Sequence, residues 1–211
     1  MNKDTINEIF SIWAEENPEP ETELEFTNVY TLVVAVVLSA QSTDVGVNKA
    51  TKKLWEVADN PEDMLKLGEE GLKKYIKTIG LYNTKAKNVI LLSKMLIDDF
   101  NSEVPRNLED LQKLPGVGRK TANVVMNCAW GEHTIAVDTH VFRVSNRIGL
   151  VSEKDVLKTE KSLLKKIPDA WLQHAHHWLI LHGRYICKAR KPMCEKCNIY
   201  SYCEYKDKDL L

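Results

Sequence analysis

The feature that most constrains this chain is a glycine turn, LPGVG at residues 114–118, set between two short stretches with helical periodicity. Its proline ends the first helix, and its two glycines permit positive φ and close backbone approach. Such a turn directs several backbone N–H groups to the start of the next helix, where an anion such as a phosphate can bind. Arg119 and Lys120 add positive charge there. The alternative is an ordinary connector between helices.

Helical periodicity continues through nearly the whole chain, and no segment shows the alternation or hairpin chemistry of strands. The valine-rich run 29–40 could pass for a buried strand. Its length of about twelve residues and the absence of a partner strand favour a central helix buried on all sides. The sequence therefore predicts an all-α protein. Further helices are expected over residues 43–55, 84–97, 152–166 and 171–184, and Gly68 and Gly71 interrupt the helical pattern that begins at residue 60.

Length and composition allow a globular protein of one large or two small domains. The chain has 211 residues, of which 44% are hydrophobic and 28% charged, which are ordinary values for globular proteins. The start MNKDTINEIF lacks the apolar region of a secretory signal, and the longest apolar run, residues 32–38, is too short to span a bilayer. We therefore expect a cytoplasmic protein without membrane association.

The charge balance argues mildly against a nucleic-acid binder unless the positive charge is clustered. The net charge is −1, from 29 basic and 30 acidic residues. Residues 184–196, however, carry five bases and one acid, a local charge of +4. A solvated surface is the simplest interpretation of such a run.

Four of the five cysteines lie within 17 residues near the end of the chain, with the spacing C-x6-C-x2-C-x5-C. Four such thiolates suit one Zn²⁺ or one iron–sulfur cluster. Zinc ribbons more often pair two CxxC units, and only one is present, but the spacing alone leaves both metals open. The four are Cys187, Cys194, Cys197 and Cys203, whereas Cys128 is expected to be a small core residue.

Lys120 and Asp138 are the two candidates for chemistry. Lys120 lies in the first turn of a predicted helix, where the helix dipole and Arg119 disfavour a protonated ammonium, and partial burial would act in the same direction. A neutral lysine is a nucleophile and can form a Schiff base. The alternative is a surface lysine that binds phosphate. Asp138 precedes an apolar helical pattern that includes Val141 and Val144, so it suits an N-cap. A capping carboxylate is held in place and can still face a substrate.

Two segments, LPGVGRKTAN at 114–123 and VDTHVFRV at 137–144, resemble the helix–hairpin–helix motif and the following Asp segment of base-excision DNA glycosylases. The resemblance is very close to the endonuclease III family and covers essentially the whole chain. It implies a two-domain all-α fold with a cleft between the domains. The six-helix domain would be residues 22–132, with the helix–hairpin–helix motif at about 108–130. Residues 1–21 with 133–211 would form the cluster-bearing domain.

The resemblance also implies a DNA glycosylase and AP lyase that removes oxidised pyrimidines. Lys120 would attack C1′ of the damaged nucleotide, and Asp138 would activate the amine or stabilise positive charge on the sugar. The base leaves, a Schiff base forms, and β-elimination cuts the strand 3′ to the lesion. Because C1′ is inaccessible in a stacked duplex, the nucleotide must be extruded. The partner is double-stranded DNA with a damaged pyrimidine or an abasic site, and we expect a monomer.

The same resemblance assigns the cysteines to a [4Fe–4S] cluster and the hairpin carbonyls to a monovalent cation. Cluster thiolates at both ends would constrain the basic loop KARKPM, so that its positive charges face phosphates. Gln41 and Leu81 match intercalating positions, and Ser39 and Asp44 are candidates for the lesion pocket. The complete set of expected DNA-binding residues is Gln41, Leu81, Gly116, Val117, Gly118, Arg119, Thr121, Lys188, Arg190 and Lys191.

Two rival functions are weaker. An adenine glycosylase of the same fold uses a Glu in the early helix, but no acid lies between Glu25 and Asp44, and a chain ending at Leu211 leaves no room for that family's C-terminal recognition domain. A non-catalytic DNA-binding module would not need both Lys120 and Asp138.

Overall fold

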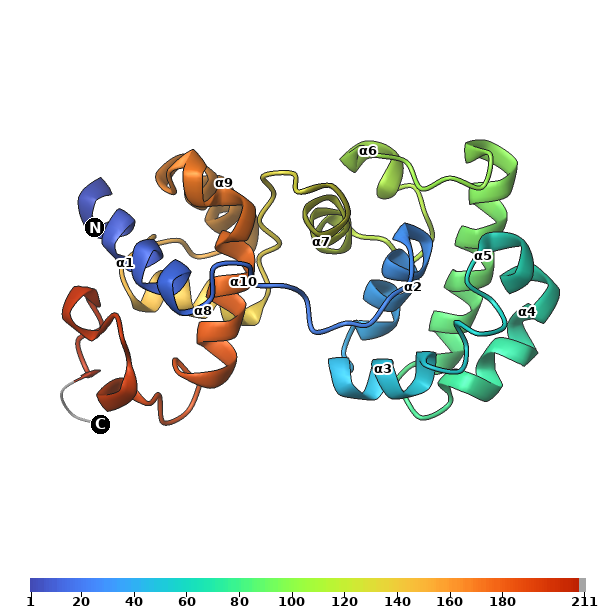
Figure 1. Cartoon of the computed structure of the whole chain (residues 1–211), viewed down its shortest axis with the longest axis horizontal. Helices are drawn as coiled ribbons and strands as arrows, with labels where there is room; N and C mark the ends of the chain where they lie inside the picture. Colours follow the sequence, from blue (N-terminus) through green and yellow to red (C-terminus); the bar gives the residue numbers. More distant parts are fainter. Residues whose placement is uncertain (209–211) are drawn as a thin grey trace. The chain divides into compact units, whose positions relative to one another are not determined.

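The computed structural model describes residues 1–208, and these residues contain helices, turns and loops but no strand (Figure 1). The all-α prediction is therefore confirmed for the described part of the chain. Two short 3₁₀ turns, Cys194–Lys196 and Tyr200–Tyr202, lie among the C-terminal cysteines. The α-helices are α1 (Lys3–Glu16), α2 (Val29–Ser39), α3 (Asp44–Thr51), α4 (Pro61–Ile76), α5 (Tyr82–Phe100), α6 (Leu108–Leu111), α7 (Arg119–Trp130), α8 (Thr139–Arg147), α9 (Val156–Lys166) and α10 (Asp169–Tyr185).

The chain forms two compact units, each with its own hydrophobic core. The first, called here the hairpin unit, is Thr22–Trp130 and contains α2 to α7. The second, called the cysteine unit, combines Met1–Glu21 with the chain from Gly131 onward and contains α1 and α8 to α10. No helix among the described residues is both long and apolar enough to cross a membrane.

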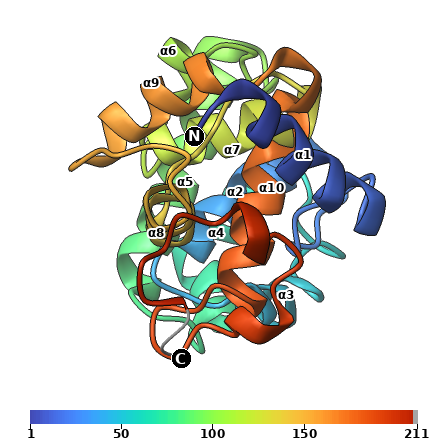
Figure 2. The same cartoon turned by 90° about the vertical axis from the view of Figure 1, so that its left-hand side faces the viewer.

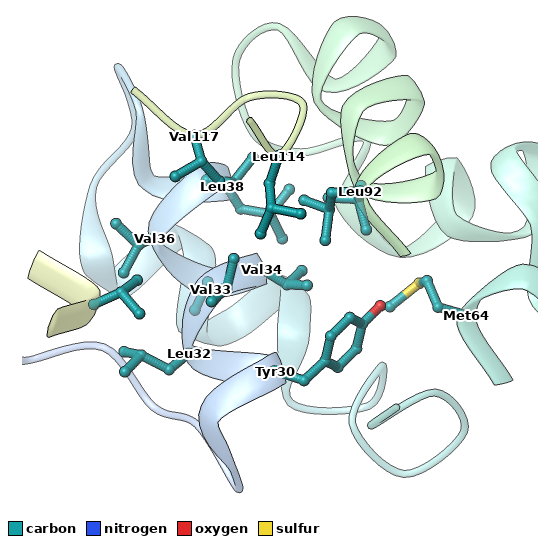
Figure 3. Close-up of a cluster of buried hydrophobic side chains, with 14 of the residues drawn as sticks. Tyr30, Leu32, Val33, Val34, Val36, Leu38, Met64, Leu92, Leu114 and Val117 are labelled. Carbon is teal, nitrogen blue, oxygen red and sulfur yellow. The ribbon is translucent and has the colours of Figure 1, made fainter. Parts of the chain in front are cut away.

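Helix α2 is the centre of the hairpin unit. Every residue from Tyr30 to Leu38 is buried, so the prediction of a helix buried on all sides is confirmed and the strand alternative is wrong. The helix begins at Val29 because Asn28 and Thr31 form a capping box, in which each side chain binds the other residue's backbone N–H. Figure 3 shows α2 side chains gathered with Leu114 and Val117, which point from the hairpin turn into the same cluster.

The ends of several helices differ from the predicted ones. The helix expected over 43–55 ends at Thr51, whose hydroxyl donates to the carbonyl of Val47 at 3.0 Å, a bond that weakens a helix locally. The helix expected over 152–166 begins only at Val156, because the Asp155 side chain caps it by accepting from a backbone N–H. Gly68, at φ 69°, interrupts α4 as its position in the pattern suggested.

In the cysteine unit, α1 lies beside α10 (Figure 2), and aromatic rings fill the contact. The ring of Phe10 in α1 lies 6.3 Å from Trp171 and 5.9 Å from Trp178, both in α10. Helix α8 packs against the C-terminal end of α10 at Gly183. A Cβ added to Gly183 would come within 2.9 Å of His140 in α8. Such close packing holds α8, and with it the backbone that follows Asp138.

Candidate functional site

The hairpin turn joins α6 to α7 and is anchored from within. Leu114 and Val117 are buried, and the Val117 N–H donates to the Leu114 carbonyl at 3.0 Å. The Gly118 carbonyl accepts from Ala122 at 2.9 Å, which is the first bond of α7. Gly116 and Gly118 are both exposed, whereas Leu114 and Val117 are buried. The result is an exposed backbone at the N-terminus of a helix, the arrangement that favours an anion.

Gly116 and Gly118 are subject to different structural constraints. Gly116 has φ +83°, and an added Cβ would lie 3.1 Å from Asn88 and 3.2 Å from Val37, so the fold alone disfavours any other residue at this position. A Cβ on Gly118 would meet nothing within 4 Å, and its φ lies outside the left-handed region. The fold therefore does not require glycine at 118, whereas a ligand that approaches the backbone closely would.

Lys120 is the second residue of α7, and its side chain is exposed. The partial burial considered from the sequence is therefore absent. None of the carboxylates in the described residues forms an ion pair with Lys120, in contrast to Lys113 before the turn, which pairs with Asp110 at 2.6 Å. The Lys120 amine thus stands at the positive end of a helix, beside Arg119, without a neutralising acid.

Asp138 caps α8 with only one of its carboxylate oxygens. Oδ1 accepts from the backbone N–H groups of His140 and Val141, each at 2.8 Å, which confirms the predicted N-cap. Oδ2 makes no hydrogen bond within the described residues. Val141 and Val144 are fully buried, so the helix that holds the carboxylate is itself anchored in the core. Asp138 is half-buried and has one oxygen available for a substrate.

Gln41 and Leu81 are exposed and share an uncommon backbone conformation. Their φ angles are 54° and 58°, in the left-handed region, which costs an L-residue about 1–2 kcal/mol. The Leu81 side chain is 58% exposed. Such strain persists only where the surroundings impose it and is frequent at functional sites. Nearby, the Ser39 hydroxyl donates to the Val36 carbonyl at 2.8 Å, and Asp44 begins α3.

The four C-terminal cysteines, Cys187, Cys194, Cys197 and Cys203, all line one pocket of the cysteine unit. Burial raises the pKa of Cys197 to about 11 and also raises the pKa values of Cys194 and Cys203, and the neighbouring thiols add to the effect. Without a bound cation these thiols therefore stay protonated at neutral pH. Within residues 1–208, no three potential ligands converge on a point that one metal ion could occupy. The four thiols nevertheless share one pocket, as the ligands of a single metal centre must.

Arg143 and Arg147 lie one helical turn apart on α8, and both donate hydrogen bonds to the start of the loop between Cys187 and Cys194. The Arg147 guanidinium donates to the Cys187 sulfur at 3.6 Å and to the Lys188 carbonyl at 2.7 Å. Arg143 donates to the Cys187 carbonyl at 3.1 Å and to the Gly183 carbonyl at 2.9 Å. Sequence reasoning missed both residues, and only their i, i+4 spacing on the helix after Asp138 could have drawn attention to them. The basic side chains of the loop, Lys188, Arg190 and Lys191, are exposed.

The class of protein follows from the helix–hairpin–helix turn, the capped Asp138 helix and the cysteine pocket together with a family comparison. Residues 34–169 match the model described as HhH-GPD superfamily base excision DNA repair protein. The chain belongs to this superfamily, as the two motif segments had predicted.

Particular relatives narrow the class. The chain is 58% identical to Endonuclease III of Rickettsia felis over 211 residues, which cover 100% of this chain and 99% of the relative. It is 56% identical to Endonuclease III of Escherichia coli (strain K12) over 208 residues, 99% of each. A solved structure of a trapped Endonuclease III–DNA covalent intermediate has a TM-score of 0.92 and 45% identity, and covers 100% of both chains. The predicted resemblance to the endonuclease III family is therefore confirmed.

Proposed function

We propose that this protein is a bifunctional base-excision repair enzyme, a DNA N-glycosylase for oxidised pyrimidines with an AP lyase activity. Its partner is double-stranded DNA that carries a damaged pyrimidine or an abasic site. The observation that carries the proposal is the unpaired, exposed amine of Lys120 in the first turn of the hairpin's second helix. A nucleophile at this place lies beside a backbone suited to hold the phosphate of the strand under attack.

In the proposed reaction, the neutral Lys120 amine attacks C1′ of the extruded nucleotide. The bond from C1′ to the base breaks, and the base leaves with the electron pair and takes up a proton. Loss of a proton from nitrogen and opening of the sugar ring leave a Schiff base. Removal of a C2′ proton then expels the 3′ phosphate, which cuts the strand 3′ to the lesion. Asp138 assists through its available Oδ2, either by accepting the amine proton or by stabilising positive charge on the sugar.

DNA binding is proposed to use the backbone of the hairpin and the charges around it. Gly116, Val117 and Gly118 bring main chain to a phosphate, and Arg119 and Thr121 flank it. A monovalent cation on the hairpin carbonyls would link this backbone to a phosphate. Gln41 and Leu81 fill the space left by the extruded nucleotide, with Ser39 and Asp44 at the lesion pocket. The exposed Lys188, Arg190 and Lys191 contact phosphates further along the duplex.

We propose that the four cysteines hold a [4Fe–4S] cluster. The four cysteines line one pocket, as the ligands of a single metal centre must. Their C-x6-C-x2-C-x5-C spacing and the similarity to Endonuclease III support a cluster over zinc. The bound cluster would fix both ends of the basic loop. The hairpin unit would then act as the six-helix domain and the cysteine unit as the cluster domain, and the protein would work in the cytoplasm, at the DNA.

The decisive experiment is borohydride trapping on a duplex that contains thymine glycol. Wild type should form a covalent protein–DNA adduct, and Lys120→Gln should form none. Lys113→Gln removes a lysine from the other side of the same turn, one already paired with Asp110, and should trap like wild type. No adduct with wild type, or an undiminished adduct with Lys120→Gln, would overturn the nucleophile assignment.

The metal is tested separately, by iron, sulfide and zinc analysis of the purified protein. Iron and sulfide in equal amounts, with broad visible absorbance, are expected, and Cys203→Ala should lose both. A colourless protein that contains zinc and cleaves fully would exclude the cluster.

A further inference from the structure

Two strained turns of the hairpin unit lie against each other. One follows α2 and carries Gln41; the other precedes α5 and carries Leu81, and both residues have positive φ. A Cβ placed on Gly80 would be 3.7 Å from the Gln41 carbonyl oxygen, so the two turns touch through their backbones. Neither conformation is favourable for its own residue, so contacts from elsewhere must hold both turns in place.

Lys85 contacts both turns at once. Its backbone N–H donates to the Leu81 carbonyl at 3.0 Å, which closes the first turn of α5. Its side chain crosses to the other turn, where Nζ donates to the Ser42 hydroxyl at 2.8 Å. Ser42 directly follows Gln41, and its own N–H donates to the Ser39 carbonyl at 3.0 Å. Lys85 is thus hydrogen-bonded both to Leu81 and to Ser42, the residue that follows Gln41.

Stability alone does not account for a lysine at this position. Lys85 is only 4% exposed, and none of the acids among the described residues forms an ion pair with it. It also lies in the first turn of α5, where the helix dipole opposes a cation. Burial lowers the pKa of Lys85 accordingly. A buried lysine without an acid carries a desolvation cost, which the hydrogen bond to Ser42 offsets only in part.

We propose that Lys85 is a positioning residue that fixes the Gln41 turn relative to the Leu81 turn, so that both side chains enter the DNA together. This inference rests on the proposed function, in which Gln41 and Leu81 occupy the space of the extruded nucleotide. The two side chains come from different turns, and filling one gap requires their tips to keep a set separation. A direct bond between the turns supplies that constraint without any contact between Lys85 and the DNA.

The test measures the entry of the two side chains with 2-aminopurine placed opposite a stable abasic-site analogue in a duplex, because the fluorescence of 2-aminopurine rises when it loses its stacking neighbours. Ser42→Ala removes only the acceptor, and Lys85→Met removes the donor while it keeps the length of the side chain. Both should slow the fluorescence rise about ten-fold, the typical effect of losing a hydrogen bond to a charged group. The double variant should be no slower than either single variant, because both remove the same bond.

Lys87→Met is the matched control, since this exposed lysine lies on the same helix and its loss changes the charge equally. It should match wild type. If Lys85→Met does not fold, Ser42→Ala still decides, because it deletes a single hydroxyl. Fluorescence rates equal to wild type in Ser42→Ala, or effects that add in the double variant, would overturn the role of Lys85. Failure of the proposed function looks different, because wild type itself would then give no borohydride adduct.

Discussion

The carboxylate of Asp138 performs a structural task and, by proposal, a chemical one, and two substitutions separate them. Asp138→Asn keeps an oxygen that can accept from the backbone N–H groups of His140 and Val141, but it removes the negative charge. Asp138→Ala removes both. The asparagine variant should therefore stay folded like wild type and lose cleavage, whereas the alanine variant should lose cleavage and stability.

The size of the stability effect follows from the cap. Asp138 Oδ1 accepts two backbone hydrogen bonds, each at 2.8 Å, and replacement of an Asp cap by Ala costs about 1 kcal/mol, with a range of roughly 0.5–2 kcal/mol. For a chain of this size, 1 kcal/mol corresponds to a Tm shift of about 2–4 °C. Asparagine is about as good a cap as aspartate, so Asp138→Asn should shift Tm by less than the alanine change.

Thermal denaturation followed by circular dichroism measures the first effect, and single-turnover cleavage of a duplex with an abasic site measures the second. Loss of a positioned acid or base lowers a rate by about 10²- to 10⁴-fold. Asp155 provides the control, because its Oδ1 caps α9 in the same way and no role in the site is proposed for it. Asp155→Ala should lose stability but keep cleavage. Wild-type cleavage by Asp138→Asn would refute the chemical role, and an unchanged Tm in Asp138→Ala would refute the energy assigned to the cap.

The remaining predictions concern the hairpin glycines and a buried histidine. Gly116→Ala should destabilise by at least about 1 kcal/mol in urea denaturation because of its positive φ and close neighbours, while Gly118→Ala should leave stability unchanged and weaken DNA binding in a titration. Equal stability losses at both positions would contradict this distinction. Burial lowers the pKa of His177 to about 4, from 6.5 in the unfolded chain. Because the unfolded state then binds more protons, His177 by itself should make stability fall by about 1 kcal/mol per pH unit as pH drops from 6.5 towards 4. Burial lowers the pKa of His182 to about 4 as well, so a similar slope remains when His177 is replaced. His177→Gln should therefore reduce the slope by about half the histidine contribution, and an unchanged slope in that variant would contradict this prediction.

Much of the fold was predictable because local patterns encode it. The run at α2 is about twelve residues long and has no partner strand, and these two features predicted a buried helix although its valines also suit a strand. Asp138 was predictable as a cap for the same reason, since its bonds reach only two and three residues along the chain. The hairpin residues are close together in sequence, and so are the four cysteines. The family model matches the segment that contains the hairpin, and the Endonuclease III relatives match over the full chain.

The contacts between residues far apart in the sequence, and the backbone conformations that these contacts impose, were decided by the tertiary structure. Only packing distinguishes Gly116, which meets Asn88 and α2, from Gly118, which meets nothing. No local pattern shows that Gln41 and Leu81 have positive φ, because both are residue types that ordinarily avoid it. The bond from Lys85 to Ser42 joins residues 43 positions apart, so a sequence read along its length shows only a helical lysine and a turn serine. Local sequence determines where helices begin and which residues line them, whereas contacts between helices determine which side chains meet, because those contacts form only when the helices pack.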